Sequence, residues 1–249
     1  MVKLAEESYN FIKLDKKGKI CILQFNRPEK KNPLSSGMRS EIIKALGDLK
    51  LDNRIKAVIF YGGEEIFTAG FDRDEVQAVV QGKTDYNEFV VSNDLFHKTL
   101  IEFPKLMIAA INGYALAGGF DLAVLCHLRI AAKNTKLGHP EIAFGACPLF
   151  FPYMELAGRG KALELTLNTA TRETFISAEE AYRLNIVNKI VEPGDVLNEA
   201  INMAKQIVKS PEFVVKQLLQ VSNLYHDRLI KFRTEIDSIL ESMKGVLGV

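Results

Sequence analysis

Hydrophobic residues in the first quarter of the chain follow two different spacings. Residues 9–14 and 19–25 alternate β-forming side chains with polar ones, and they flank a turn-forming group at 15–18. Residues 36–49 repeat apolar side chains at helical spacing, and 57–61 form a short apolar run that two glycines close. The pattern predicts a β-hairpin, then a helix, then a buried strand.

The order of helix and strand is repeated further along. Residues 95–103 predict a helix that Pro104 stops, and 106–111 predict another buried strand that ends at Asn112-Gly113. Such alternation favours parallel strands joined by crossover helices, and sites in these folds gather where strand ends meet helix N-termini. We therefore expect an α/β protein with its functional site in those loops.

The pattern becomes helical toward the end of the chain. Residues 177–180, Ser-Ala-Glu-Glu, form a capping box that predicts a helix start, and Gly194 marks a boundary. Two amphipathic segments follow at 196–208 and, after a proline, at 212–243. We expect a helical C-terminal subdomain rather than a second catalytic domain.

Composition narrows the class of protein. The 249 residues are 47% hydrophobic and carry 32 Lys and Arg against 31 Asp and Glu, which is enough for a sizeable core. A net charge of +1 provides no field to attract nucleic acid or a membrane surface. The start of the chain is charged where a secretory signal would be apolar, and no apolar run approaches about 18 residues. We expect a cytoplasmic protein.

Cysteines and histidines support no metal or thiol chemistry. The three cysteines lack CxxC spacing, which is typical of reduced, mostly buried thiols. The four histidines form no pair at metal-ligand spacing, and there is no Gly-x-Ser-x-Gly nucleophile elbow. These residues are Cys21, Cys126, Cys147, His97, His127, His139 and His226.

Two glycine-rich loops follow the buried strands, at 66–72 and 112–121. In the second, Gly119 stands where a phosphate loop needs its lysine. A helix that starts near Gly118 would expose unpaired N–H groups and a positive dipole end, which stabilise an oxyanion. For either loop alone, close packing of the glycines is an equally good interpretation.

Five motifs follow one another along the chain: Asn26-Arg27-Pro28, Ala69 to Asp72, Asn112 to Gly119, His139-Pro140-Glu141 and Ser177 to Ala181. Taken together and in this order, they resemble the crotonase family, also called the enoyl-CoA hydratase/isomerase family. The resemblance implies a spiral of repeated ββα units, with a core and acyl-CoA site in 1–193 and a helical trimerisation region in 194–249. It also implies a homotrimer or a dimer of trimers.

The resemblance also assigns the reacting groups. The backbone N–H groups of Phe71 and Gly118 would bind the thioester oxygen, and Asp121 and Glu141 would be the acid/base pair. Each such donor is typically worth about 3 kcal/mol in the transition state. Hydratases of the family usually carry glutamate at both positions, with one water between them, whereas Asp121 is shorter by roughly one carbon–carbon bond, about 1.5 Å. The dienoyl-CoA isomerase branch has aspartate there, but a further aspartate where this chain has Leu149.

Contacts with the substrate come from the same resemblance. No cofactor and no metal are implied, because coenzyme A is part of the substrate. The lysine that usually follows the Ala-Gly-x-Asp motif is replaced here, so Arg73 is expected to substitute for it. The expected substrate-binding residues are Lys31, Leu34, Ala69, Gly70, Asp72, Arg73, Tyr114, Leu116, Pro140, Pro148 and Leu149.

The leading hypothesis is an enzyme that performs syn hydration of a 2-enoyl-CoA through an oxyanion-stabilised enolate. A double-bond isomerase of enoyl-CoA or dienoyl-CoA is an alternative, because Asp121 and the apolar run at 149–152 depart from the hydratase pattern. A decarboxylase or thioester hydrolase would use the same oxyanion site. From another class, a non-catalytic acyl-CoA-binding scaffold is the rival, and the retained carboxylates argue against it. No basic stripe supports RNA binding.

Overall fold

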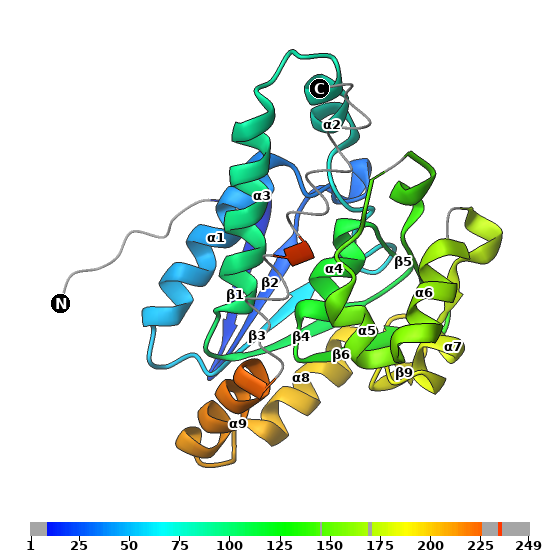
Figure 1. Ribbon diagram of the computed structural model, residues 1–249. Helices are drawn as coiled ribbons and strands as arrows, with labels where there is room; N and C mark the ends of the chain where they lie inside the picture. Colours follow the sequence, from blue (N-terminus) through cyan, green and yellow to red (C-terminus); the bar gives the residue numbers. More distant parts are fainter. Residues whose placement is uncertain (1–8, 145, 169–170, 226–233, 236–249) are drawn as a thin grey trace.

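A twisted six-stranded sheet forms the centre of the computed structural model, which describes residues 9–144, 146–168, 171–225 and 234–235 (Figure 1). Its order is β1-β2-β3-β4-β6-β9, and a smaller sheet has the order β5-β7-β8. The strands of the large sheet are β1 (Ile12–Lys17), β2 (Ile20–Phe25), β3 (Ala57–Tyr61), β4 (Leu106–Ile111), β6 (Leu128–Ala132) and β9 (Lys189–Val191). Those of the small sheet are β5 (Tyr114–Leu116), β7 (Lys136–Gly138) and β8 (Ile176–Ser177).

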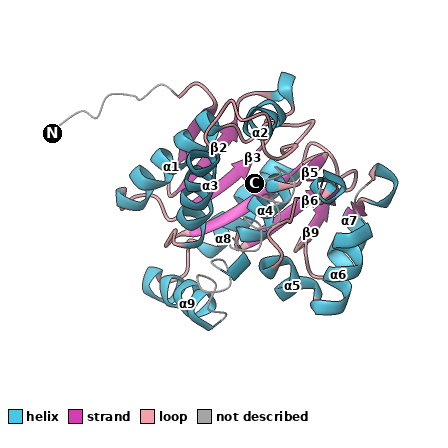
Figure 2. Cartoon of the chain, turned by 45° about the horizontal axis from the view of Figure 1, so that its top comes forward, coloured by secondary structure: helices cyan, strands magenta, loops and turns pink. Residues whose placement is uncertain are grey.

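Helices lie on both faces of the large sheet and around the small one (Figure 2). They are α1 (Ser36–Leu51), α2 (Arg73–Val80), α3 (Tyr86–Ile101), α4 (Gly118–Leu125), α5 (Phe151–Ala157), α6 (Arg159–Asn168), α7 (Ala178–Arg183), α8 (Val196–Ile207) and α9 (Glu212–Tyr225). Short 3-10 helices occupy Pro28–Lys30, Pro140–Phe144 and Arg172–Thr174. No helix in these described ranges is both long and apolar enough to span a lipid bilayer.

Strand pairing confirms the predicted hairpin and the parallel sheet. β1 pairs antiparallel with β2, and the chain reverses through Gly18 at a φ of 64°. The turn is tighter than expected, because residues 15–17 belong to β1. All later neighbours in the large sheet pair in parallel. β4 is followed by β5 and then α4, which is one of the ββα units that the resemblance implies.

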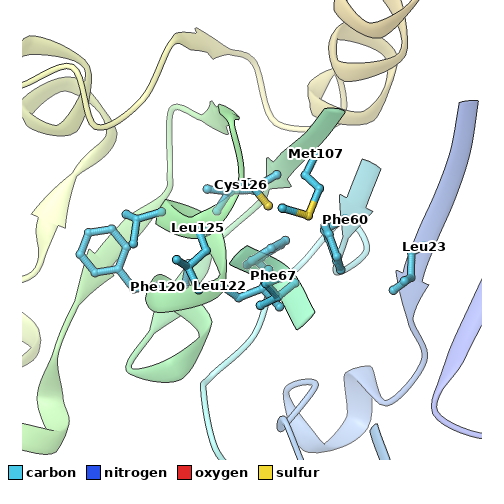
Figure 3. Packing of buried hydrophobic residues seen from close by; sticks show 14 of the residues in the cluster. Leu23, Phe60, Phe67, Met107, Phe120, Leu122, Leu125 and Cys126 are labelled. Atoms are coloured by element: carbon cyan, nitrogen blue, oxygen red, sulfur yellow. The ribbon is translucent and has the colours of Figure 1, made fainter. Parts of the chain in front are cut away.

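The core has two layers, one on each face of the large sheet. Alternate side chains of β2, β3 and β4 pack against α1, α3 and α4, and this larger cluster includes Leu23, Phe60, Phe67, Met107 and Phe120 (Figure 3). The intervening side chains face α8, which buries its apolar stripe on β2, β3, β4 and β6. Because their strands are covered on both faces, 57–61 and 106–111 read as unbroken apolar runs in the sequence.

Some helix boundaries differ from the sequence prediction. α3 begins at Tyr86 rather than 95, with Asp85 capping it by accepting a hydrogen bond from the Glu88 N–H at 3.0 Å. Its first half has no continuous apolar stripe, since Val91 is exposed there. α2 was not expected at all. The predicted helix 212–243 is seen as α9 up to Tyr225, and most of its remainder lies outside the described residues.

Only one of the two hydrogen bonds of the predicted capping box forms. Ser177 accepts the hydrogen bond from the Glu180 N–H at 3.2 Å, but the Glu180 carboxylate pairs with Arg183 instead of reaching back. Cys21 and Cys126 are buried thiols as expected, whereas Cys147 is exposed. The division into a core and a trimerisation region stays a prediction, and α8 is part of the packing of the large sheet.

A buried arginine ties α4 to the last strand. Arg129 on β6 is 3% exposed, and its guanidinium donates to the carbonyls of Cys126 at 2.5 Å and of Ile186. It therefore caps the C-terminal end of α4 and also holds the segment that leads into β9. A cation at this end of a helix is also favoured by the helix dipole.

Replacing Arg129 should destabilise the fold. In Arg129→Met both carbonyls lose their donor, and we expect the free energy of unfolding to fall by roughly 3 kcal/mol, since each unpaired buried carbonyl costs about 1–3 kcal/mol. Urea denaturation followed by circular dichroism measures the loss. The control Arg159→Met, at an exposed position, should change stability by less than about 0.5 kcal/mol. Equal stability of the Arg129→Met variant and the parent would contradict this interpretation.

Candidate active site

Two loops at the carboxyl ends of β3 and β4 touch each other. The Thr68 N–H donates to the carbonyl of Tyr114 at 3.1 Å, and the Leu116 N–H donates to the carbonyl of Thr68 at 3.2 Å. A side chain at Gly70 would lie 2.6 Å from the Leu116 carbonyl, and one at Gly119 would lie 2.5 Å from the Thr68 methyl. Glycine at both positions is therefore what allows this contact.

A third segment of the chain supports the loop that follows β3. Asn32 is fully buried, and its amide nitrogen donates to the carbonyl oxygens of Gly62 at 2.7 Å and Phe67 at 3.2 Å. In return, the Thr68 hydroxyl donates to the Asn32 carbonyl at 2.6 Å. Sequence reasoning placed residues 26–34 at the substrate without singling out Asn32. The structure shows that this side chain supports the loop after β3.

The two expected oxyanion donors lie on the touching segments. Gly118 is the first residue of α4, and the preceding Ala117 has a φ of 50°, which is strained for a residue with a side chain. The Phe71 ring packs against Gly118: a Cβ atom added to Gly118 would lie only 2.5 Å from the ring. Within the described part of the chain, neither the Phe71 N–H nor the Gly118 N–H has a hydrogen-bond partner. Both are free to donate.

Asp121 lies in the first turn of α4 and is 4% exposed. Burial is the largest cause that raises the pKa of this carboxyl well above its ordinary value, and the charges of Glu141 and Glu235 raise it further. A hydrogen bond from the backbone N–H of Leu149 lowers the pKa in part. This carboxyl therefore holds a proton more readily than an ordinary aspartate does, and in its protonated form it can donate a proton or a hydrogen bond.

His139 connects the two acids. Its Nδ1 lies 3.1 Å from Oε1 of Glu141 and 3.9 Å from Oδ1 of Asp121. The ring is 1% exposed and packs between Phe120 and Tyr153, with centroid separations of 4.9 and 5.9 Å. Sequence reasoning used His139 only as part of a motif. Its spacing of two residues from Glu141 was the one available signal of this contact.

Each acid also has an oxygen available for a ligand. Oδ1 of Asp121 and Oε2 of Glu141 are buried and accept no hydrogen bond from any residue that the structure describes. Glu141 sits in the 3-10 helix Pro140–Phe144, where its side chain is 19% exposed. Unpaired buried oxygens of this kind cost stability unless a ligand or water satisfies them.

A third carboxyl group was not expected. Oε2 of Glu235, in the short described segment that is red in Figure 1, accepts a hydrogen bond from the Phe150 N–H at 2.7 Å. Burial raises the pKa of Glu235 to about 7, and hydrogen bonds from the N–H groups of Phe150 and Phe151 oppose that rise. No local motif surrounds Glu235, so the sequence held no signal of its position beside residues 85 places earlier.

The expected substrate contacts lie around these loops in different environments. Lys31 and Arg73 are exposed, and Tyr114 is exposed with its ring edge against Phe175. Asp72 caps α2 by accepting from the Asp74 N–H at 3.0 Å. Ala69, Leu116 and Pro140 are half-buried, whereas Leu34, Gly70, Pro148 and Leu149 are buried. Contact of these residues with a substrate stays a prediction.

No metal site accompanies the two acids in the part of the chain described. The His, Cys, Asp and Glu side chains there form no group of three that could hold an ion. The site thus consists of two free backbone donors and a pair of acids, Asp121 buried and Glu141 half-buried, that lie on either side of a histidine.

Comparison with known proteins gives one consistent result. The family described as Enoyl-CoA hydratase/isomerase matches residues 15–242. The Short-chain-enoyl-CoA hydratase of Clostridium acetobutylicum is 35% identical over 220 residues, which cover 86% of this chain and 81% of the relative. The Crotonyl-CoA hydratase of Syntrophomonas wolfei is 34% identical over 213 residues, which cover 84% and 80%.

Solved structures show the same likeness in three dimensions. An enoyl-CoA hydratase/isomerase from Xanthobacter autotrophicus superposes with a TM-score of 0.81 at 25% identity, covering 97% of this chain and 87% of that one. The order of strands and helices is therefore shared over nearly the whole chain.

Glu235 should control the ionisation of its neighbours. Burial, followed by the charge of Glu235, raises the pKa of the exposed Cys147 thiol. In Glu235→Gln the amide oxygen still accepts the Phe150 N–H, but the charge is gone. We expect the pKa values of Cys147 and of Asp121 both to fall. The rate of Cys147 alkylation should then rise at pH 8, because more of the thiol is ionised.

The pH dependence of iodoacetamide labelling measures the Cys147 pKa, and carbon-13 NMR of labelled aspartate follows Asp121. The matched control is Glu102→Gln, an exposed glutamate after α3 at the other edge of the sheet. Both titrations should be the same in this control and in the parent. An unchanged alkylation profile in Glu235→Gln would show that Glu235 does not lie beside Cys147.

Proposed function

Because the chain belongs to the enoyl-CoA hydratase/isomerase family, we propose that this enzyme adds water across the double bond of a short 2-enoyl-CoA thioester. The family match covers residues 15–242, and the similar relatives are a short-chain-enoyl-CoA hydratase and a crotonyl-CoA hydratase. The observation that carries the proposal is the acid pair, in which the buried Asp121 and the half-buried Glu141 both approach Nδ1 of His139. No cofactor other than the coenzyme A of the substrate is required.

In the proposed mechanism, the thioester oxygen accepts hydrogen bonds from the N–H groups of Phe71 and Gly118. When water adds to C3, the electrons of the double bond move through C2 to this oxygen, and an enolate forms. Donors fixed by the backbone need no reorganisation as that charge develops, and each is worth about 3 kcal/mol. The absence of any other partner for the two N–H groups in the described residues supports this role.

The two acids would then move the protons. Glu141 accepts one proton from the attacking water, whose oxygen bonds to C3, and the same proton then passes to C2 and completes the addition. Asp121, whose pKa is raised by burial, orients the water or relays that proton. Both acids end in the state in which they began, so the net change is one water added. A positioned acid or base of this kind typically contributes about 10²–10⁴-fold in rate.

Isomerisation is the second candidate, and Glu235 favours it. The dienoyl-CoA isomerase branch has a third acid at the position of Leu149, whose side chain is here buried in the core. Glu235 places a carboxyl group at the neighbouring N–H groups of Phe150 and Phe151 instead. With the apolar residues 148–151 beside it, such a site can shuttle a proton between two carbons while excluding water.

For assembly, we propose the homotrimer or dimer of trimers that the family resemblance implies, built through residues 194–249. α9 supports this, because Phe213, Leu218 and Val221 are all more than half exposed on it. Exposed apolar side chains that cluster on one helix mark an interaction surface. Sedimentation equilibrium tests the proposal, and a monomer at micromolar concentration would contradict it.

Glu141→Gln should abolish most of the hydration of crotonyl-CoA. The amide keeps the size of the side chain but cannot accept the water proton, so we expect kcat to fall by about 10²–10⁴-fold. Loss of the conjugated-thioester absorbance and a mass increase of one water follow the reaction. The control Glu102→Gln should retain full activity, since this residue is exposed and remote from the acid pair.

A parallel assay with 3-hexenoyl-CoA separates the alternatives. Movement of its double bond, with no water added to crotonyl-CoA, would assign the enzyme as an isomerase. No turnover of either substrate, with CoA-thioester binding that Glu141→Gln leaves unchanged, would contradict both and leave an acyl-CoA-binding scaffold.

A further inference from the structure

A second pocket lies at the edge of the large sheet opposite the candidate active site. It has a volume of about 270 Å³. Three of its lysines, Lys19, Lys56 and Lys105, each directly precede a parallel strand, namely β2, β3 and β4. The register places them side by side, because Ile20 pairs with Ala57, and Ala57 with Leu106.

The end of α8 and the first turns of α9 close this pocket from the other side (bottom of Figure 1). Lys209 in the connecting loop and Lys216 on α9 bring the number of lining lysines to five, against the single acid Glu212. The rest of the lining is largely apolar and includes Pro104, Leu106 and Val208. The pocket is therefore a cationic site with apolar walls, in a chain whose net charge is only +1.

Pairing inside the described chain leaves much of this positive charge uncompensated. Glu212 is shared between Lys56 at 2.6 Å and Lys216 at 3.0 Å, and these contacts lower its pKa to about 2. Lys105 donates to the backbone carbonyls of Leu49 and Asp52, which carry no net charge. Burial lowers the pKa of Lys105, and so do the charges of Lys56 and Lys216, whereas the charges of Asp52 and Glu212 oppose that fall in part. Bringing an anion into the pocket would relieve this repulsion.

Two further features indicate what kind of anion fits. Lys19 and Lys209 are exposed, and no ion pair is formed by either one within the residues described. The helix α9, which follows Pro211 and is 14 residues long, also begins at this pocket. Free N–H groups at the start of a helix favour anions. Lysines and a helix N-terminus around a small volume are a common arrangement for phosphate groups.

We propose that this pocket binds the phosphoryl group of a small phosphorylated molecule, between Lys19, Lys56 and Lys209 at the start of α9. The apolar wall formed by Pro104 and Val208 would contact the body of that molecule. The volume suits one compact group rather than a nucleic acid or an extended acidic peptide. The site is separate from the acyl-CoA site, which lies at the carboxyl ends of the same strands, and it does not depend on the proposed hydration.

Calorimetric titration of the full chain with inorganic pyrophosphate tests the proposal. The double variant Lys19→Ala/Lys209→Ala removes two exposed side chains that form no ion pair with any residue that the structure describes, so it should fold normally. We expect it to bind pyrophosphate about tenfold more weakly, as two charge contacts of ordinary strength predict. Its turnover of crotonyl-CoA should be unchanged, since neither lysine is near the acid pair.

Two matched variants make the test specific. Lys50→Ala/Lys98→Ala removes the same charge from exposed positions on α1 and α3 and should bind pyrophosphate like the parent. Glu212→Gln removes a carboxylate that repels the anion, so this variant should bind pyrophosphate about threefold more tightly than the parent. The change is opposite in direction to that expected for Lys19→Ala/Lys209→Ala.

The source of the phosphoryl group can be identified in the same experiment. If coenzyme A binds with two molecules per chain and the Lys19→Ala/Lys209→Ala variant retains one, the second site takes the phosphates of CoA itself. If CoA binds once per chain while pyrophosphate still binds in its presence, the site takes a different phosphorylated molecule. Absence of pyrophosphate binding to the parent at millimolar concentration would overturn the proposal. So would equal weakening in the Lys50→Ala/Lys98→Ala control, which would mean non-specific attraction.

Discussion

The close approach of the loops after β3 and β4 is the constraint on which the site depends. Gly70 and Gly119 allow it, since any side chain at either position would overlap the facing loop. This contact fixes where α4 begins, and thereby the Gly118 N–H and the carboxyl of Asp121 one turn of helix later. Parallel strands supply the coarse placement, because their carboxyl ends meet at one edge of the sheet. The two glycines then allow the loops to approach each other to contact distance.

Burial of the acids is the second constraint, and it conflicts with stability. Burial, followed by the charges of Glu141 and Glu235, raises the pKa of Asp121, and burial followed by the charges of all three acids raises the pKa of Cys147. Holding ionisable groups together in a buried place costs folding free energy, and sites that do so are candidates for chemistry for that reason. His139 relieves part of the cost at Glu141, because its Nδ1 lies within hydrogen-bond distance of that carboxylate, at 3.1 Å from Oε1. The core packing of Phe120 and Tyr153 keeps that ring in place.

The sequence predicted the features that local pattern encodes. Strands 57–61 and 106–111 were found because they are buried on both faces, and the start of α4 was found from its glycines. The early half of α3 was missed because its outward side chains leave no periodic stripe. Asn32 and Glu235 were missed because their partners lie far away along the chain. A single sequence without alignment carries no signal for such long-range polar contacts.

The position of Leu149 shows how a motif comparison and a structure can point in different directions. By motif, leucine at this position removes the third acid of the dienoyl-CoA isomerase branch. In the structure, the Leu149 backbone N–H reaches Asp121, and Glu235 meets the next two N–H groups of the same segment. The acidic group is therefore supplied by the C-terminal part of the chain, where it receives hydrogen bonds from the start of α5. A chain that receives a third acid from its C-terminal part can keep an apolar wall at Leu149 and still bring the charges of Glu141 and Glu235 close to Asp121. In the proposed mechanism, the choice of reaction then depends on whether water can enter between Asp121 and Glu141, because hydration needs that water and double-bond migration needs its exclusion.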